Sequence, residues 1–158
     1  MARYTVRLDT VPTGHSLPPL LADFGKWLGT KTYGSLGYFE LSATEVPREW
    51  NPEVAERLQR DAVCFLNLPD GSLLALLRFD AEAPPAVVLL GSEGEARTVS
   101  SSLEGLLHAI AGGNTDLSDI DEDGDGRQAL SDWLDETGVD VPDVADAPDF
   151  NVYLADGA

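Results

Sequence analysis

Four short apolar runs between Ala62 and Ser100 limit the folds open to this chain more than any other feature. The runs read AVCFLNL, LLALLRF, AVVLLG and ARTVS, and only a few residues separate each run from the next. Parallel neighbours need a crossover of a dozen or more residues, so strands this close in sequence are expected to pair antiparallel. The turn PDGS contains a glycine, which can adopt the positive φ of tight turns. The sequence therefore predicts an antiparallel sheet.

Helical patterns surround these runs. Apolar residues recur at spacings of three and four, with prolines near some first turns and glycines after some last turns. The predicted helices are 17–28, 51–60, 102–113 and 127–138, and two further strands are expected at 5–11 and 36–43. Together these elements predict an α+β fold.

We therefore expect one domain over residues 1–138, built on a mainly antiparallel sheet of about four to six strands flanked by helices. Residues 139–158 form an acidic, proline-bearing tail. Its apolar residues could still dock on the body of the domain; they are Phe150, Val152, Tyr153 and Leu154.

Several features predict a cytoplasmic protein. No run of about 18 apolar residues is present, so no membrane-spanning helix is expected. The start of the chain, MARYTVRLDTVPTG, lacks the apolar core of a secretory signal. Cys64 is the single cysteine, and its apolar neighbours predict a buried, inert thiol.

The charge is strongly negative and unevenly distributed. The chain holds 28 acids against 10 Lys and Arg, a formal net charge of −18. Residues 1–79 hold nine acids and eight bases, a net of −1, whereas residues 80–158 hold 19 acids and two bases, a net of −17. Such a field repels nucleic acid and anionic membranes and speeds encounter with a basic protein. The alternative is that the acids serve solubility alone.

The segment DEDGDGRQALSD, residues 121–132, nearly matches a calcium-binding loop. The predicted ligands are the side chains of Asp121, Asp123 and Asp125, the backbone carbonyl of Arg127, and the side chain of Asp132. Against this, the last position is Asp rather than Glu, and no entering helix is evident. The other interpretation is an acidic lead-in that caps the following helix, with Asp125 as the cap. The sequence leaves both open.

No catalytic constellation is evident. His15 lies in a loop rich in Pro and Gly, and His108 lies on a predicted helix, each without the neighbours of a triad or a zinc motif. Glu93 and Glu95 fall in a short turn between strands, where they are expected to face water. We therefore expect that the protein is not an enzyme and needs no cofactor, Ca²⁺ excepted.

Two stretches carry a resemblance to a known family. They are FLNLPDGSLLALLRF and PPAVVLLGSEGEARTVSSSLEGLLHAIAGG. With the glycine-rich segment before them, they span roughly residues 34–113, half of the chain, and resemble the SUKH superfamily. Its members include bacterial immunity proteins and yeast cell-wall-synthesis regulators. The resemblance implies an α+β fold with an antiparallel sheet, and a non-enzymatic role that often consists of binding and neutralising a toxin.

The leading hypothesis is thus a protein-binding module of bacterial immunity type, with a protein partner such as a basic toxin. Acids would attract the partner and apolar residues would anchor it. The candidate partner-binding residues are Trp50, Asp116, Asp119, Asp132, Trp133, Asp135 and Phe150. Alternatives are a calcium-binding or calcium-stabilised domain that uses residues 121–132, a small regulatory scaffold, and a small enzyme.

Overall fold

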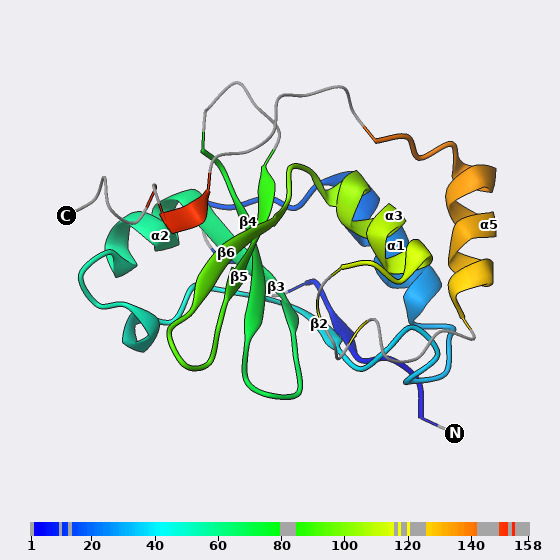
Figure 1. Ribbon diagram of the computed structural model, residues 1–158, viewed down its shortest axis with the longest axis horizontal. Helices are drawn as coiled ribbons and strands as arrows, with labels where there is room; N and C mark the ends of the chain where they lie inside the picture. The colour runs from blue at the N-terminus through cyan, green and yellow to red at the C-terminus, as the bar shows by residue number, and fades with distance from the viewer. Residues whose placement is uncertain are drawn as a thin grey trace.

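The computed structural model shows an α+β domain built on one six-stranded sheet (Figure 1). It describes residues 2–9, 11–12, 14–79, 85–115, 117, 120, 126–141, 149–151 and 153. The strands follow one another across the sheet in sequence order. They are β1 (Val6–Arg7), β2 (Glu40–Thr44), β3 (Ala62–Asn67), β4 (Leu73–Leu77), β5 (Ala86–Leu90) and β6 (Ala96–Ser100).

Strands β2 to β6 pair antiparallel, and for β3 to β6 this is the pairing that the short connections predict. At the β3–β4 turn Gly71 has a φ of +93°, and the Asp70 carboxylate accepts a hydrogen bond from the Ser72 backbone N–H at 2.9 Å. The edge strand β1 differs, because it pairs parallel to β2 with Val6 opposite Leu41. A long connection containing a helix separates these two strands, which is what a parallel pair requires.

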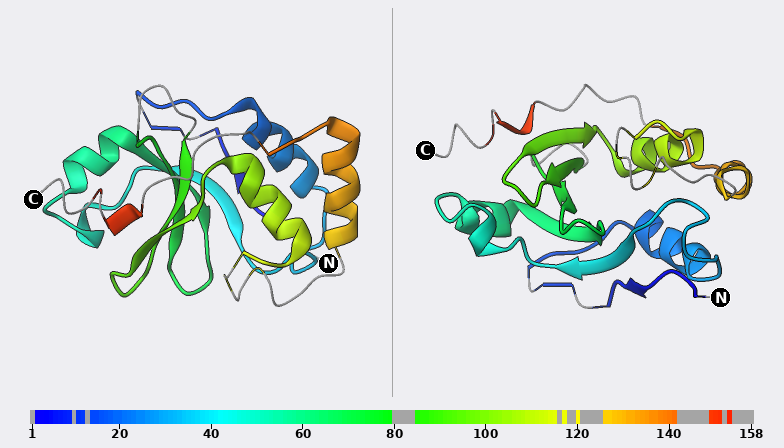
Figure 2. Two further views of the ribbon diagram at one scale, coloured as in Figure 1. Left: turned by 45° about the horizontal axis from the view of Figure 1, so that its top comes forward. Right: turned by 60° about the horizontal axis from the view of Figure 1, so that its bottom comes forward.

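Helices lie on both faces of the sheet (Figure 2). Helices α1 and α3 pack on one face, and α5 packs outside them. Helix α2 and the short 3₁₀ helix η1 lie on the other. Their bounds are Pro19–Leu28 for α1, Arg48–Trp50 for η1, Ala55–Asp61 for α2, Leu103–Gly112 for α3 and Arg127–Thr137 for α5.

Several predicted bounds differ from the structure. The strand expected at 5–11 is only Val6–Arg7. The strand expected from residue 36 begins at Glu40, because Gly34 and Gly37 adopt positive φ and form a loop before it. The helix expected from residue 51 begins at Ala55, and η1 precedes it. At α3, Ser102 is the cap, since its side chain accepts a hydrogen bond from the Gly105 N–H at 3.0 Å.

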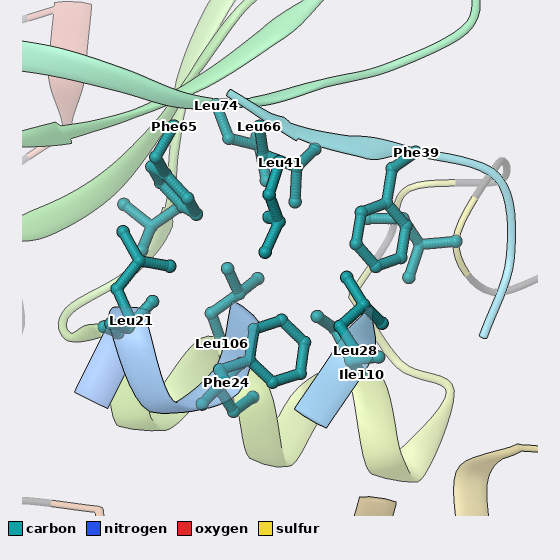
Figure 3. Close-up of a cluster of buried hydrophobic side chains, with 14 of the residues drawn as sticks. Leu21, Phe24, Leu28, Phe39, Leu41, Phe65, Leu66, Leu74, Leu106 and Ile110 are labelled. Atoms are coloured by element: carbon teal, nitrogen blue, oxygen red, sulfur yellow. The ribbon is translucent and has the colours of Figure 1, made fainter. Parts of the chain in front are cut away.

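The main core lies between the sheet and helices α1 and α3 (Figure 3). Leucine, isoleucine and phenylalanine side chains from the helices point toward apolar side chains of β2, of the residue before it, and of β3 and β4. They include Leu21, Phe24, Leu28, Phe39, Leu41, Phe65, Leu66, Leu74, Leu106 and Ile110, all buried. Each such side chain contributes about 1.5–3 kcal/mol to the free energy of folding when it leaves water.

A second core covers the opposite face of the sheet. Along β5, Val87 and Leu89 belong to the main core, whereas Val88 and Leu90 belong to the second. This alternation explains why β5 is apolar throughout, since both of its faces are covered. The second core also takes up Leu58 from α2.

No helix in the described ranges is long and apolar enough to cross a membrane.

Candidate functional site

Helix α5 presents an acidic face to solvent. Leu130 and Leu134 are buried in the main core. Asp132, Asp135 and Glu136 are exposed on the other side of the helix. This separation follows from helical periodicity, because residues four apart share a face. None of these three carboxylates forms an ion pair with any residue that the structure describes. The Asp132 carboxylate instead accepts a hydrogen bond from Gln128 Nε2 at 3.0 Å.

The basic residue of α5 points away from this face. The Arg127 guanidinium packs over the end of α3, so close that a Cβ on Gly113 would lie 2.4 Å from Nη1. Gly113 itself adopts a left-handed φ of +69°, which favours glycine there for a second reason. The outer face of α5 therefore keeps its negative charge without an arginine beside it.

The structure describes only part of the predicted calcium loop. Asp121, Asp123 and Asp125 lie outside the described residues, as do the candidate partner-binding residues Asp116 and Asp119. Arg127 is the first residue of α5, so the helical pattern directs its carbonyl to the N–H four residues on. Among the described residues there is no group of three or more His, Cys, Asp or Glu that could hold a metal ion. Calcium binding by residues 121–132 stays an alternative hypothesis.

Gly126 fills the position where the calcium-loop template has a glycine for a sharp turn. Its φ is −92°, so the backbone does not turn there through the left-handed region. Its N–H donates to the Ser35 carbonyl at 2.7 Å, and a Cβ at this position would lie 2.7 Å from the same oxygen. Glycine is needed at 126 because the loop before β2, which contains Ser35, passes so close to the start of α5.

Two of the predicted aromatic anchors lie in the second core. Phe150 has an exposed fraction of 0%, so its interpretation as a surface anchor is wrong for the folded chain. Its ring centroid lies 6.2 Å from that of Trp50, which is half-buried and donates from Nε1 to the Gly91 carbonyl at 2.9 Å. Both rings cover the same face of the sheet, so their apolar surface packs against the domain itself.

The C-terminal segment, residues 149–151 and 153, is docked on the body through Tyr153 as well. The Tyr153 hydroxyl donates to the Asp61 carboxylate at 2.6 Å, and the Arg57 guanidinium lies 4.0 Å from the Tyr153 ring centroid. Burial, with the adjacent Asp61 carboxylate, raises the pKa of Tyr153. Burial alone would raise the pKa of Asp61, but hydrogen bonds from Arg60 and Tyr153 outweigh it and lower that pKa.

Trp133 packs at the seam between α5 and α1. Its ring centroid lies 5.7 Å from that of Trp27 and 6.0 Å from that of Phe24. Trp27 and Trp133 are both half-buried. The two tryptophans are 106 positions apart in the sequence, so no local pattern pairs them and only packing brings them together.

The candidate catalytic residues do not converge. Cys64 is buried in the second core, where burial raises the pKa of its thiol to about 12. His15 bonds through Nε2 to the Gln59 carbonyl at 2.6 Å, and His108 to the Val139 carbonyl at 2.8 Å. Neither contact is to a nucleophile or a carboxylate.

One polar cleft was not predicted from the sequence. It has a volume of about 230 Å³ and lies beside the start of α1 and the adjoining ends of β3 and β4. Its polar side chains are His15, Ser16, Asp61 and Arg78. These residues come from three separate segments, which explains why no local sequence signal marked the cleft.

Comparison with family models, curated proteins and solved structures finds no match to this chain. The fold and surface define it as an α+β domain with a six-stranded, mostly antiparallel sheet, helices on both faces and an acidic outer helix.

Proposed function

We propose that this chain is a non-enzymatic protein-binding module of bacterial immunity type, which acts in the cytoplasm. Its partner is a basic protein such as a toxin, and the docking face is the outer face of α5. The observation that carries the proposal is the set of three exposed carboxylates there, Asp132, Asp135 and Glu136, none in an ion pair with a described residue. Acids that are not neutralised within their own chain remain free to act on a partner.

The charge distribution supports the same proposal. Helix α5 belongs to residues 80–158, which carry a net charge of −17. A field of that size raises the association rate of a cationic protein and makes the rate fall with ionic strength. Exposed charges mainly set encounter and orientation, so affinity also needs an apolar or aromatic anchor.

The resemblance to the SUKH superfamily supports the immunity role. It implied an antiparallel sheet flanked by helices within an α+β fold, and this chain has that architecture. The resembling residues, roughly 34–113, include strands β2 to β6 and helix α3. A shared architecture is compatible with many functions, so the binding experiment below decides.

The test compares two triple variants with equal changes in charge. One is Asp132→Asn, Asp135→Asn and Glu136→Gln on α5. The control is Glu49→Gln, Glu53→Gln and Glu56→Gln, three exposed acids around η1 and α2. Each variant is immobilised and exposed to extract of the native host at low and moderate salt, and captured proteins are identified and quantified.

We expect one basic protein that the wild type and the control capture at low salt and release as salt rises. The α5 variant should retain much less of it, because its steering carboxylates are gone. Equal retention by both variants, or capture indifferent to salt, would refute the proposal. An identified partner can then be expressed alone and together with this chain, where neutralisation of toxicity tests the immunity role directly.

A further inference from the structure

Trp27 of α1 and Trp133 of α5 contact each other where the two helices meet, and we call them the tryptophan pair. The two ring planes make an angle of 32° with centroids 5.7 Å apart. Phe24 lies behind both rings in the main core, with centroids 6.1 Å and 6.0 Å away. Each indole is half-buried, so part of it stays in contact with solvent. Large half-buried aromatic rings are typical of interaction surfaces.

A cation of the same chain already occupies this surface. The Lys31 Nζ lies over the Trp27 ring, 4.9 Å from its centroid. The distance is within the range of a cation–π contact, in which the negative face of the ring attracts the ammonium. Trp27 thus has a ring face that a positively charged side chain can reach from solvent.

Carboxylates flank the pair on both helices. Asp23 lies one turn before Trp27 on α1, and Glu136 lies one turn after Trp133 on α5; both are exposed. Helices α1 and α5 run in roughly opposite directions (Figure 1). Because Asp23 precedes Trp27 and Glu136 follows Trp133 in sequence, both acids lie toward the same end of the pair. Lys31 lies toward the other end. A cation that lies over the pair would therefore meet aromatic faces and negative charge together.

We infer that the tryptophan pair is the anchor for an arginine side chain of the basic partner, which replaces Lys31 over the ring of Trp27. This inference rests on the proposed function and names the chemistry at the edge of the same docking face, where α5 meets α1. A planar guanidinium suits the site better than an ammonium, because it stacks on indole while its N–H groups donate to a carboxylate. In the free protein, Lys31 occupies the position over the Trp27 ring that the partner's arginine takes in the complex.

The probe is N-acetyl-argininamide, with the neutral isostere N-acetyl-citrullinamide as its control. The three indole N–H signals of the intact protein are followed by NMR and assigned with single Trp→Phe variants. Trp50 is an internal reference, because its N–H is bonded to the Gly91 carbonyl on the other side of the molecule. We expect the arginine probe to move the Trp27 and Trp133 signals, and the citrulline probe to move neither.

Two lysine variants separate competition from bulk charge. Lys31→Ala removes the resident cation, whereas Lys26→Ala removes an equal charge from an exposed position of α1 that no ring contact involves. We expect Lys31→Ala to bind the arginine probe about two- to fivefold more tightly than the wild type, the range for an exposed cation–π contact. Lys26→Ala should change the affinity much less.

The inference would be overturned if the two lysine variants bound the arginine probe with equal affinity. It would also be overturned if the indole signals stayed fixed while backbone signals near other acids moved. The proposed function has a separate failure, since it depends on whether the α5 carboxylates control capture of the protein partner. If capture depends on them but Lys31→Ala and Lys26→Ala behave alike, the binding face stands and the tryptophan anchor is refuted.

Discussion

One face of the sheet is covered by helices, each of which carries its own apolar stripe, whereas the other is closed with the help of residues from the far end of the chain. On the main face, α1 and α3 supply leucine and phenylalanine side chains (Figure 3). On the second face, α2 is short, and Phe150 and Tyr153 complete the cover. Small strand residues such as Cys64 and Ala75 make room for these rings. The comparison shows that the second face depends on a long-range contact and the first on local patterns.

The largest expected effect is on the main face. Phe24→Ala should lower the free energy of unfolding by about 3–5 kcal/mol, because it removes a buried ring between α1 and the sheet and leaves a cavity. Urea denaturation followed by circular dichroism measures the loss. A loss below about 1 kcal/mol would mean that the main core repacks and that the two faces do not differ as described.

On the second face, Phe150→Ala should cost less, on the order of 1–3 kcal/mol, although Phe150 is equally buried. The reason is that a terminal segment can detach locally while the rest stays folded. Trp50, which contacts the Phe150 ring, should then become more exposed, and its fluorescence should shift to the red. A loss as large as that of Phe24→Ala would show that both faces form one cooperative unit.

A weaker effect is expected at Tyr153, which makes a polar contact on the same face of the sheet. Tyr153→Phe removes the hydrogen bond to Asp61 and should cost about 1 kcal/mol near neutral pH. The folded chain lowers the pKa of Asp61, so this contribution is present above the unfolded value of about 3.9 and is lost as pH falls through the lower folded value. The difference between wild type and variant should thus shrink in acid, as urea denaturation across pH 2–7 would show. A difference that grows in acid would contradict the assignment.

The smallest expected effect concerns calcium. We expect no heat when millimolar Ca²⁺ is titrated into chelator-treated protein, because α5 begins at Arg127 and its carbonyl lies within the helix. A one-to-one binding isotherm that Mg²⁺ does not reproduce would contradict this expectation. It would also favour the calcium-stabilised alternative for residues 121–132.

Much of the fold could be predicted because it depends on local signals. Short connections predicted the antiparallel order of β3 to β6, and three- and four-residue spacings predicted helices at α1, α3 and α5. Ser102 and Gly113 mark the two ends of α3 through their own hydrogen bonding and φ preferences. The starts of β2 and α2 were placed too early, because glycine loops and 3₁₀ turns lie at those boundaries and their spacing signals are weak.

Local sequence signals predicted only part of the candidate site. Asp132 and Asp135 were selected from charge, and both are exposed on α5. Phe150 was selected as an apolar anchor for a partner, yet it is buried, because the burial of one aromatic ring depends on what the rest of the chain places around it.

The amino-acid sequence by itself determined the α+β class, the antiparallel order of β3 to β6, the positions of the main helices and the excess of negative charge in residues 80–158. Each of these follows from neighbouring residues or from counting. Only the tertiary structure decided that Trp27 meets Trp133 and that Tyr153 reaches Asp61. Contacts between residues so far apart are selected by the shape and chemistry of whole surfaces as they pack, and local propensities do not encode them.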